Sequence, residues 1–197
     1  MRRDGVLRAA RDLAESDGWA AVTMRRLAGA LGVTQPVLYT AFPSRQALID
    51  AVALNGFGDL AAALAAVDAS PLARMAAYLG FAAAHPRVYE AMSSMPSGLA
   101  FATEDIPEPL RRAFAGLRDA FPDPDGTRAE VAWAALHGLA TLQASGRLRA
   151  SQAHARLDLT HRLLTQPQAH DAVVARPATA QDPQKSRKSA PRRGDTP

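Results

Sequence analysis

Apolar side chains recur at a helical period along most of the chain, and short breaks separate one pattern from the next. The first pattern covers residues 4–17 and ends at Gly18. Two short patterns follow, over residues 24–31 and 35–42. Each begins after a threonine, which is a favourable N-cap residue, and Gly32 separates the two. The spacing therefore predicts three helices in the first 42 residues, two of them barely two turns long.

The rest of the chain carries longer helical patterns with recognisable starts. Prolines at 71 and 86 stand where the first turn of a helix tolerates them. Thr127 and Glu130 have the spacing of a capping box, and Ser151 is a candidate cap for the last helix. Further helices are predicted over residues 45–67, 71–85, 86–93, 108–120, 127–147 and 152–166.

These patterns predict an all-α fold of about nine helices, made of a three-helix head and a helical body. Alanine dominates the apolar residues, which favours helix and close helix packing. Residues 93–109 are rich in Pro, Gly and Ser and are predicted to form a loop. Residues 167–197 hold almost no large apolar side chains, so we expect a disordered basic tail.

Composition narrows the class of protein. The chain has no cysteine, which excludes disulfides and thiolate metal sites. We find no signal peptide, and the longest alanine and leucine stretch, residues 60–67, is too short to cross a bilayer. A cytoplasmic protein without membrane contact is expected. The net charge of +4 comes from the two ends of the chain, which can be ordinary solvated charge unless a motif supports nucleic-acid binding.

Such a motif lies between residues 23 and 48. Two short helices joined by Gly32 and Val33 form a helix-turn-helix. Its predicted core comprises Leu27, Ala28, Leu31, Val33, Leu38 and Phe42. The positions left on the surface of the second helix are Gln35, Pro36, Val37, Tyr39 and Thr40.

The surface positions suit a DNA groove. Glutamine reads adenine edges, and the methyl groups of Val37 or Thr40 can touch thymine methyls. Tyrosine and threonine hydroxyls suit phosphates, and Thr34 and Ser44 place helix N-termini where backbone N–H groups can meet phosphates. The alternative is two short helices in an ordinary bundle, which leaves the display of Tyr39 beside the buried Leu38 unexplained.

This region resembles the TetR (tetracycline-repressor) family of transcriptional regulators. The resemblance covers residues 4–50, and its motif has the order L-A-x-x-L-G-V-x-x-x-x-L-Y-x-x-F-x-[SN]-[KR]-x-x-L. It implies that Gln35, Pro36 and Val37 face bases, that Arg25 reaches a base or phosphate, and that Tyr39 and Arg45 hold phosphates. The DNA-binding residues predicted in this way are Thr23, Arg25, Thr34, Gln35, Pro36, Val37, Tyr39, Thr40, Ser44 and Arg45. Thr40 and Ala41 depart from the residues common in the family, so the operator contacts stay open.

The body resembles the WHG subgroup of the same family through Trp133, His137 and Gly138. The resemblance implies that the last two long helices, over residues 127–147 and 152–166, pair with their copies in a four-helix bundle. The predicted dimer-interface residues are Ala132, Leu136, Leu139, Leu142, Leu157 and Leu163. Each of them suits the core of the protomer equally well.

Most of the large or soft side chains of the body can line an apolar ligand pocket. The candidates are Phe81, His85, Tyr89, Met92, Met95, Phe101, Phe114, Trp133 and His137. Ordinary core packing is the alternative for each of them, and His137 suits a satisfied hydrogen bond in the core as well as a pocket.

Catalytic motifs are absent from the sequence. None of the five histidines forms H-x-x-x-H or H-E-x-x-H, and there is no G-x-S-x-G or phosphate-binding loop. We therefore expect no enzymatic activity, no metal site and no cofactor.

The sequence thus predicts a ligand-responsive transcription regulator with three parts, at residues 1–46, 47–166 and 167–197. A homodimer is expected on a near-palindromic operator, with a small apolar or aromatic effector that releases it. Repression is expected, although activation fits the sequence equally well. The rivals are a small-molecule carrier with a vestigial head and an α-helical enzyme.

Overall fold

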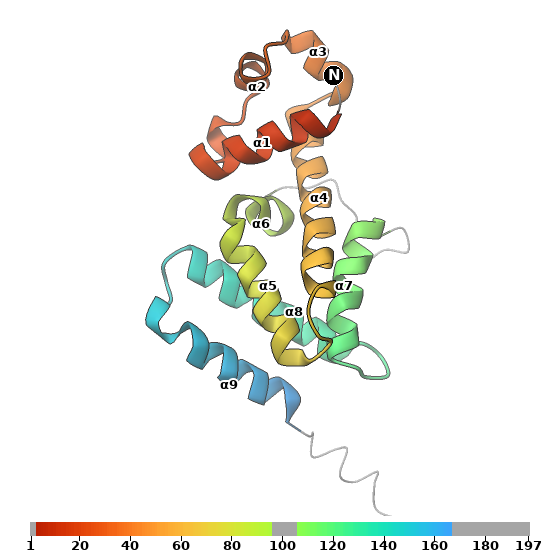
Figure 1. Ribbon diagram of the computed structural model, residues 1–197, viewed down its shortest axis with the longest axis vertical. Coiled ribbons are helices and arrows are strands. Elements are labelled where there is room, and N and C mark those ends of the chain that lie inside the picture. Colours follow the sequence, from red (N-terminus) through yellow and green to blue (C-terminus); the bar gives the residue numbers. More distant parts are fainter. Residues whose placement is uncertain (1–2, 96–105, 167–197) are drawn as a thin grey trace, which may run out of the picture. The chain divides into compact units, whose positions relative to one another are not determined.

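Residues 3–95 and 106–166 are described in the computed structural model of the chain (Figure 1). The tail predicted at 167–197 and most of the loop predicted at 93–109, with Phe101, lie outside them. The described residues up to Thr165 form one compact unit in which no strand occurs. Its helices are α1 Arg3–Asp17, α2 Met24–Ala30, α3 Gln35–Ala41, α4 Arg45–Ala65, α5 Pro71–Ala84, α6 Pro86–Ser93, α7 Glu108–Ala120, α8 Thr127–Ala144 and α9 Ala153–Thr165, with short 3₁₀ segments η1 Trp19–Ala21 and η2 Ala150–Gln152. The all-α prediction is confirmed.

Local capping explains why the head breaks into short helices. The Thr23 hydroxyl accepts a hydrogen bond from the backbone N–H of Arg26 at 3.2 Å, and the Ser44 hydroxyl accepts one from Ala47 at 3.0 Å. After α2 the chain turns at Gly32, whose φ is +65°. Residues with a Cβ atom rarely adopt this backbone conformation, so the glycine ends α2 and allows α3 to start soon after it.

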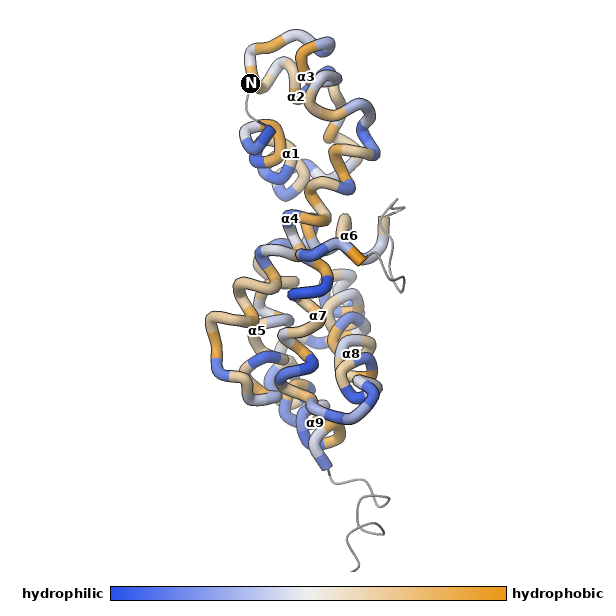
Figure 2. Tube along the Cα trace, turned by 90° about the vertical axis from the view of Figure 1, so that its right-hand side faces the viewer, coloured by the Kyte–Doolittle hydropathy of each residue, from blue (hydrophilic) through white to orange (hydrophobic). Residues whose placement is uncertain are grey.

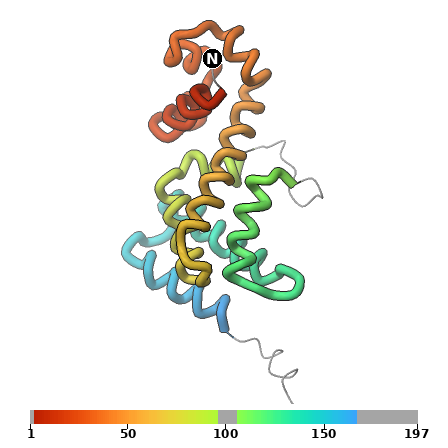
Figure 3. Tube along the Cα trace, turned by 45° about the vertical axis from the view of Figure 1, so that its right-hand side comes forward, coloured from red at the N-terminus to blue at the C-terminus, as the bar shows by residue number. Residues whose placement is uncertain are grey.

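Helix α4 is the centre of the fold. Nine of its residues are buried, and α1, α5, α6 and α7 pack against it. Figure 3 shows α4 running from the head into the body. Among the described helices, α4 is long and apolar enough to cross a membrane by length and composition. Half of its apolar window is buried inside the protein, as expected for the core helix of a globular fold. Figure 2 shows the hydropathy along the described chain.

Two helix starts differ from the sequence prediction. Helix α8 is capped by Gly126, and its first turn is held by two carboxylates of the preceding turn instead of a Thr127–Glu130 capping box. Asp125 accepts a hydrogen bond from the Thr127 backbone at 3.0 Å, and Asp123 accepts one from the Arg128 backbone at 2.9 Å. Ser151 lies within η2, so α9 begins at Ala153 without it. Asp123 and Asp125 therefore accept the hydrogen bonds at the start of α8 that the capping box was expected to provide.

Candidate nucleic-acid interface and ligand cavity

The two short helices of the head pack as the motif predicts. Leu27, Leu38 and Phe42 are fully buried, and Ala28 is almost so. The chain returns from α2 through a hydrogen bond from the Val33 N–H to the Ala28 carbonyl at 3.0 Å. Helix α3 is thereby held against α2 by one face only, and its opposite face is left to solvent.

The exposed face of α3 carries Gln35, Pro36, Val37, Tyr39 and Thr40. Tyr39 is 46% exposed although its neighbour Leu38 is completely buried. The Thr40 hydroxyl donates a hydrogen bond to the Val37 carbonyl at 2.7 Å, so its methyl group is the part not engaged within the helix. The face has no charged side chain and offers one amide, one phenol and several apolar groups.

The arginines around this face differ in their contacts. Arg25 is exposed on α2, and no contact ties its side chain to the described residues. Arg26 forms an ion pair with Asp17, and the pKa of that carboxyl is lowered mainly by the hydrogen bond from Arg26. Arg45 is half-buried and donates from Nε to the Val22 carbonyl at 2.7 Å and from Nη2 to the Trp19 carbonyl at 2.6 Å.

The position of Arg45 changes its expected role. Two of its N–H groups hold the 3₁₀ segment η1 against the start of α4, so they are not free for a phosphate. Ser44 likewise uses its hydroxyl as the cap of α4. Both residues were predicted to bind DNA, and the structure gives their side chains contacts within the head.

The body contains a cavity of about 390 Å³ between four helices. Of the predicted ligand-binding residues, Tyr89, Met92, Trp133 and His137 line it. Sequence reasoning missed Phe57 of α4 and Tyr78 of α5, together with Ser93 and Ala134. Phe57 and Tyr78 belong to helices whose apolar spacing indicated only core, and no local pattern distinguishes a cavity wall from core.

Four other predicted ligand residues lie outside the cavity lining. Phe81 is buried and packs against the ring of His85, with the ring centroids 5.3 Å apart. Phe114 meets Trp133 edge-on, with centroids 6.3 Å apart. Met95 is partly buried against the core. These side chains pack against neighbouring residues and do not line the cavity.

A chain of hydrogen bonds crosses the cavity wall. The hydroxyls of Tyr78 and Tyr89 lie 2.9 Å apart, and the Tyr89 hydroxyl lies 2.9 Å from Nδ1 of His137. Burial raises the pKa of Tyr78 and of Tyr89 above the ordinary phenol value, so both phenols are neutral at physiological pH. His137 therefore belongs both to the cavity lining and to a hydrogen-bonded network.

Helix α6 connects this wall to the head. Its Tyr89, Met92 and Ser93 line the cavity. At its N-terminus, the Glu15 carboxylate of α1 accepts hydrogen bonds from the backbone N–H groups of Arg87 and Val88, at 3.2 and 3.0 Å. The indole of Trp19 donates to the Arg87 carbonyl at 2.8 Å. One eight-residue helix thus contacts both the cavity and the head.

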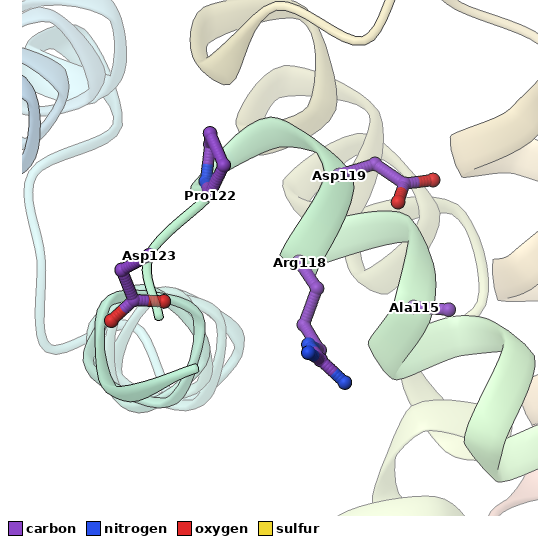
Figure 4. Close-up of a pocket in the computed structure, with 5 residues that line it drawn as sticks. All are labelled: Ala115, Arg118, Asp119, Pro122 and Asp123. Carbon is purple, nitrogen blue, oxygen red and sulfur yellow. The ribbon is translucent and has the colours of Figure 1, made fainter. Parts of the chain in front are cut away.

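A smaller depression of about 230 Å³ lies at the turn between α7 and α8. Figure 4 shows Arg118, Asp119 and Asp123 at its edge, with side chains that point in different directions. Asp123 uses one oxygen to hold the start of α8. The pKa of the nearby Asp125 carboxyl is lowered mainly by the hydrogen bond from the Thr127 backbone. These acids act as local caps. Among the described residues, no group of three or more His, Cys, Asp or Glu has the arrangement to hold a metal ion.

The predicted dimer residues divide into two groups. Ala132 and Leu136 are completely buried within the protomer, which leaves no side-chain surface for a partner and corrects their assignment. Leu139 and Leu157 are half-buried, whereas Leu142 and Leu163 are 38% and 61% exposed. Val131 and Leu159, which were not among the predicted residues, are both 50% exposed, because a helical period does not say which apolar stripe faces its own core.

Comparisons with known proteins agree with this arrangement. Residues 6–52 match the family model of bacterial regulatory proteins of the tetR family, and residues 72–166 match that of the tetracyclin repressor-like C-terminal domain. The chain is 45% identical over 53 residues to the tetracycline repressor protein class C of Escherichia coli, of which it spans only 24%. It is 31% identical to the transcriptional regulator AlkX of Mycobacterium tuberculosis over 62% of this chain and 63% of that protein.

Solved structures show the same fold. A protein with unknown function from Rhodococcus sp. RHA1 is 30% identical, covers 83% of this chain and 95% of its own, and has a TM-score of 0.64. A TetR variant from Acinetobacter baumannii in complex with minocycline is 18% identical, covers 83% and 92%, and has a TM-score of 0.55. With both parts of the chain matched by models of one family and the helix-turn-helix in place, this chain is a member of the TetR family of DNA-binding transcriptional regulators.

Proposed function

We propose that the chain represses transcription as a homodimer bound to a near-palindromic operator, and that a small molecule in the cavity releases it. The observation that carries this proposal is the double role of α6, which lines the cavity with Tyr89 and Met92 and receives the head through Glu15 and Trp19. A ligand that displaces α6 changes the position of the head.

DNA binding is assigned to the exposed face of α3. Gln35 is placed to read an adenine, while Pro36, Val37 and the Thr40 methyl group offer apolar contacts to thymine methyls. Tyr39 and the free Thr34 hydroxyl are proposed phosphate contacts, supported by their exposure. Arg25 supplies the nearby positive charge. Thr23, Ser44 and Arg45 hold the helices that present these residues.

Dimerisation is assigned to α8 and α9. Helix α9 has no fully buried residue, although Leu157 and Leu164 pack partly against the core. Val131 and Leu142 on α8 and Leu159 and Leu163 on α9 leave exposed apolar surface on both helices. Pairing these helices with their copies buries that surface and gives two heads for two half-sites.

Ligand control follows from differential affinity. A ligand shifts the DNA-binding equilibrium only as far as it prefers one position of α6 over another, typically by about 1–3 kcal/mol. The A. baumannii relative holds minocycline, and the cavity of this chain supports the same kind of role with its own lining. We divide the chain into a head, residues 1–46, and a body, residues 47–166, acting together on cytoplasmic DNA. Occupancy of the operator by the dimer is the simplest route to repression.

Selection of bound sequences from a random DNA pool tests the DNA-binding part. The wild-type protein is expected to enrich one near-palindrome. Gln35→Ala is expected to lose about 1–3 kcal/mol on that sequence and to tolerate replacement of one base pair in each half-site. Gln152→Ala, an exposed glutamine far along the chain, is the matched control. Enrichment of the same sequence by Gln35→Ala with unchanged affinity would show that α3 is not the recognition face.

A further inference from the structure

Among the described residues, the wall of the 390 Å³ cavity contains hydrogen-bonding groups but no residue with a carboxylate, ammonium or guanidinium group. Its polar side chains are Tyr78, Tyr89, Ser93, Trp133 and His137. What such a wall recognises depends on which of these groups still has a proton to donate after their mutual hydrogen bonds are made. The directions of those bonds therefore decide the kind of ligand.

The three-member chain Tyr78–Tyr89–His137 has two possible directions. In the first, the Tyr78 O–H donates to Tyr89, and the Tyr89 O–H donates to Nδ1 of His137. In the second, Nδ1–H of His137 donates to Tyr89, the Tyr89 O–H donates to Tyr78, and the Tyr78 O–H needs another acceptor. A neutral imidazole carries its proton on one nitrogen only, so the direction also fixes which nitrogen of His137 is protonated.

The surroundings of Tyr78 select the first direction. Its side chain is 2% exposed, and its neighbouring hydrogen-bonding groups are Tyr89 and the indole of Trp133. An indole N–H donates and cannot accept. In the second direction, the Tyr78 O–H would be buried without an acceptor among the described residues, which is costly. In the first direction, the Tyr78 proton goes to the Tyr89 oxygen, 2.9 Å away.

The one hydroxyl of the described wall outside this chain is already engaged. The Ser93 hydroxyl donates to the Tyr89 carbonyl at 2.7 Å. Phe57, Met92 and Ala134 have no polar proton. Besides the indole N–H of Trp133, the remaining donor is Nε2–H of His137, which has no partner among the described residues and belongs to a half-buried side chain at the cavity.

We infer that the cavity selects an uncharged, largely apolar ring compound that carries a hydrogen-bond acceptor, such as an aromatic ketone, and that Nε2–H of His137 donates to that acceptor. This inference rests on the proposed ligand-binding role of the cavity and names the class of compound it takes. His137 is then a specificity-determining residue, and the two tyrosines are positioning residues that fix its tautomer.

The tautomer is measured directly with a long-range ¹H–¹⁵N correlation spectrum of the ligand-free protein at pH 8. The expected result is an unprotonated Nδ1 and a protonated Nε2 on His137. The opposite tautomer would overturn the inference without any reference to ligands.

Two probes of the same shape test the acceptor. We choose 2-acetylnaphthalene, which carries a carbonyl oxygen, and 2-isopropenylnaphthalene, in which a methylene group replaces it, and measure both by calorimetric titration. The wild-type protein is expected to bind the ketone about fivefold more tightly, as one net hydrogen bond gives. His137→Phe is expected to bind both probes equally, and His154→Phe, an exposed histidine on α9, is expected to keep the preference.

The outcomes separate this inference from the proposed function. Equal binding of the two probes to the wild-type protein would overturn the acceptor and leave the cavity as a ligand site. Failure of both probes to bind would overturn the inference and the proposed ligand site together. Circular dichroism of each variant shows that a lost preference does not come from unfolding.

Discussion

The DNA-binding head and the helical body present their chemistry in different ways. In the head, the exposed groups come from one seven-residue helix, α3, and each is placed by its neighbours in sequence. In the body, the cavity takes side chains from four helices, α4, α5, α6 and α8, and its lining residues extend from Phe57 to His137. A substitution on α3 therefore acts locally, whereas a substitution at a helix crossing of the body changes several walls at once.

The largest effect is expected from two adjacent residues of α3, one buried and one exposed. Leu38→Ala removes a completely buried side chain and is expected to lower the free energy of unfolding by about 2–5 kcal/mol. Tyr39→Ala removes a side chain that is 46% exposed and is expected to weaken operator binding with little change in stability. Urea denaturation and a DNA-binding titration measure the two quantities. A large loss of stability in Tyr39→Ala would contradict the division of α3 into a buried and a reading face.

A second pair of variants tests the crossing of α4 and α6. A Cβ atom on Gly56 would lie 2.6 Å from Cγ1 of Val88 and 2.7 Å from Sδ of Met92. The methionine can shift, but the branched valine is stiff, so Gly56→Ala is expected to cost about 1–3 kcal/mol and to disturb the cavity wall.

Gly58 of the same helix provides the control for this crossing. A Cβ atom there meets only Nη2 of Arg112, at 4.0 Å. Gly58→Ala is expected to stabilise the protein by about 0.5–1 kcal/mol, because alanine favours the helix. Equal unfolding free energies for the two variants in urea would show that the crossing does not depend on the glycine.

Two arginines of the head allow a structural role to be compared with a DNA-binding role. Arg45→Ala removes the hydrogen bonds to the Trp19 and Val22 carbonyls, of which Trp19 keeps the one from the Val22 N–H, and is expected to lower the free energy of unfolding by about 1–3 kcal/mol. Arg25→Ala is expected to leave stability unchanged and to reduce the salt dependence of DNA binding by about one ion. Thermal unfolding and binding at several salt concentrations measure both. If Arg45→Ala changed only the salt dependence, its phosphate role would be restored.

The smallest effect is expected at the contact between head and body. Glu15→Gln removes the negative charge from the N-terminus of α6, which costs about 0.3–1 kcal/mol at such a site. It is also expected to reduce the factor by which operator DNA weakens ligand binding, measured with 2-acetylnaphthalene. Glu130→Gln, an exposed glutamate in the first turn of α8, is the control. An unchanged factor would indicate that α6 communicates with the head by another contact.

The sequence by itself determined the helix order, the helix-turn-helix and the exposed face of α3. These features depend on caps, on a glycine with positive φ and on a periodicity that operates within a few residues. The same local rules explain why Leu38 was expected inside and Tyr39 outside, as the structure has them.

Only the tertiary structure decided the contacts that join distant segments. It placed Tyr78 and Phe57 in the cavity wall, gave Arg45 the carbonyls of Trp19 and Val22, and buried Ala132 and Leu136 within the protomer. A helical pattern states that a residue is apolar and on one stripe, but it does not state which neighbouring helix covers that stripe. That choice is made by how the helices pack together around α4, and it determines which side chains reach a cavity, a partner or the core.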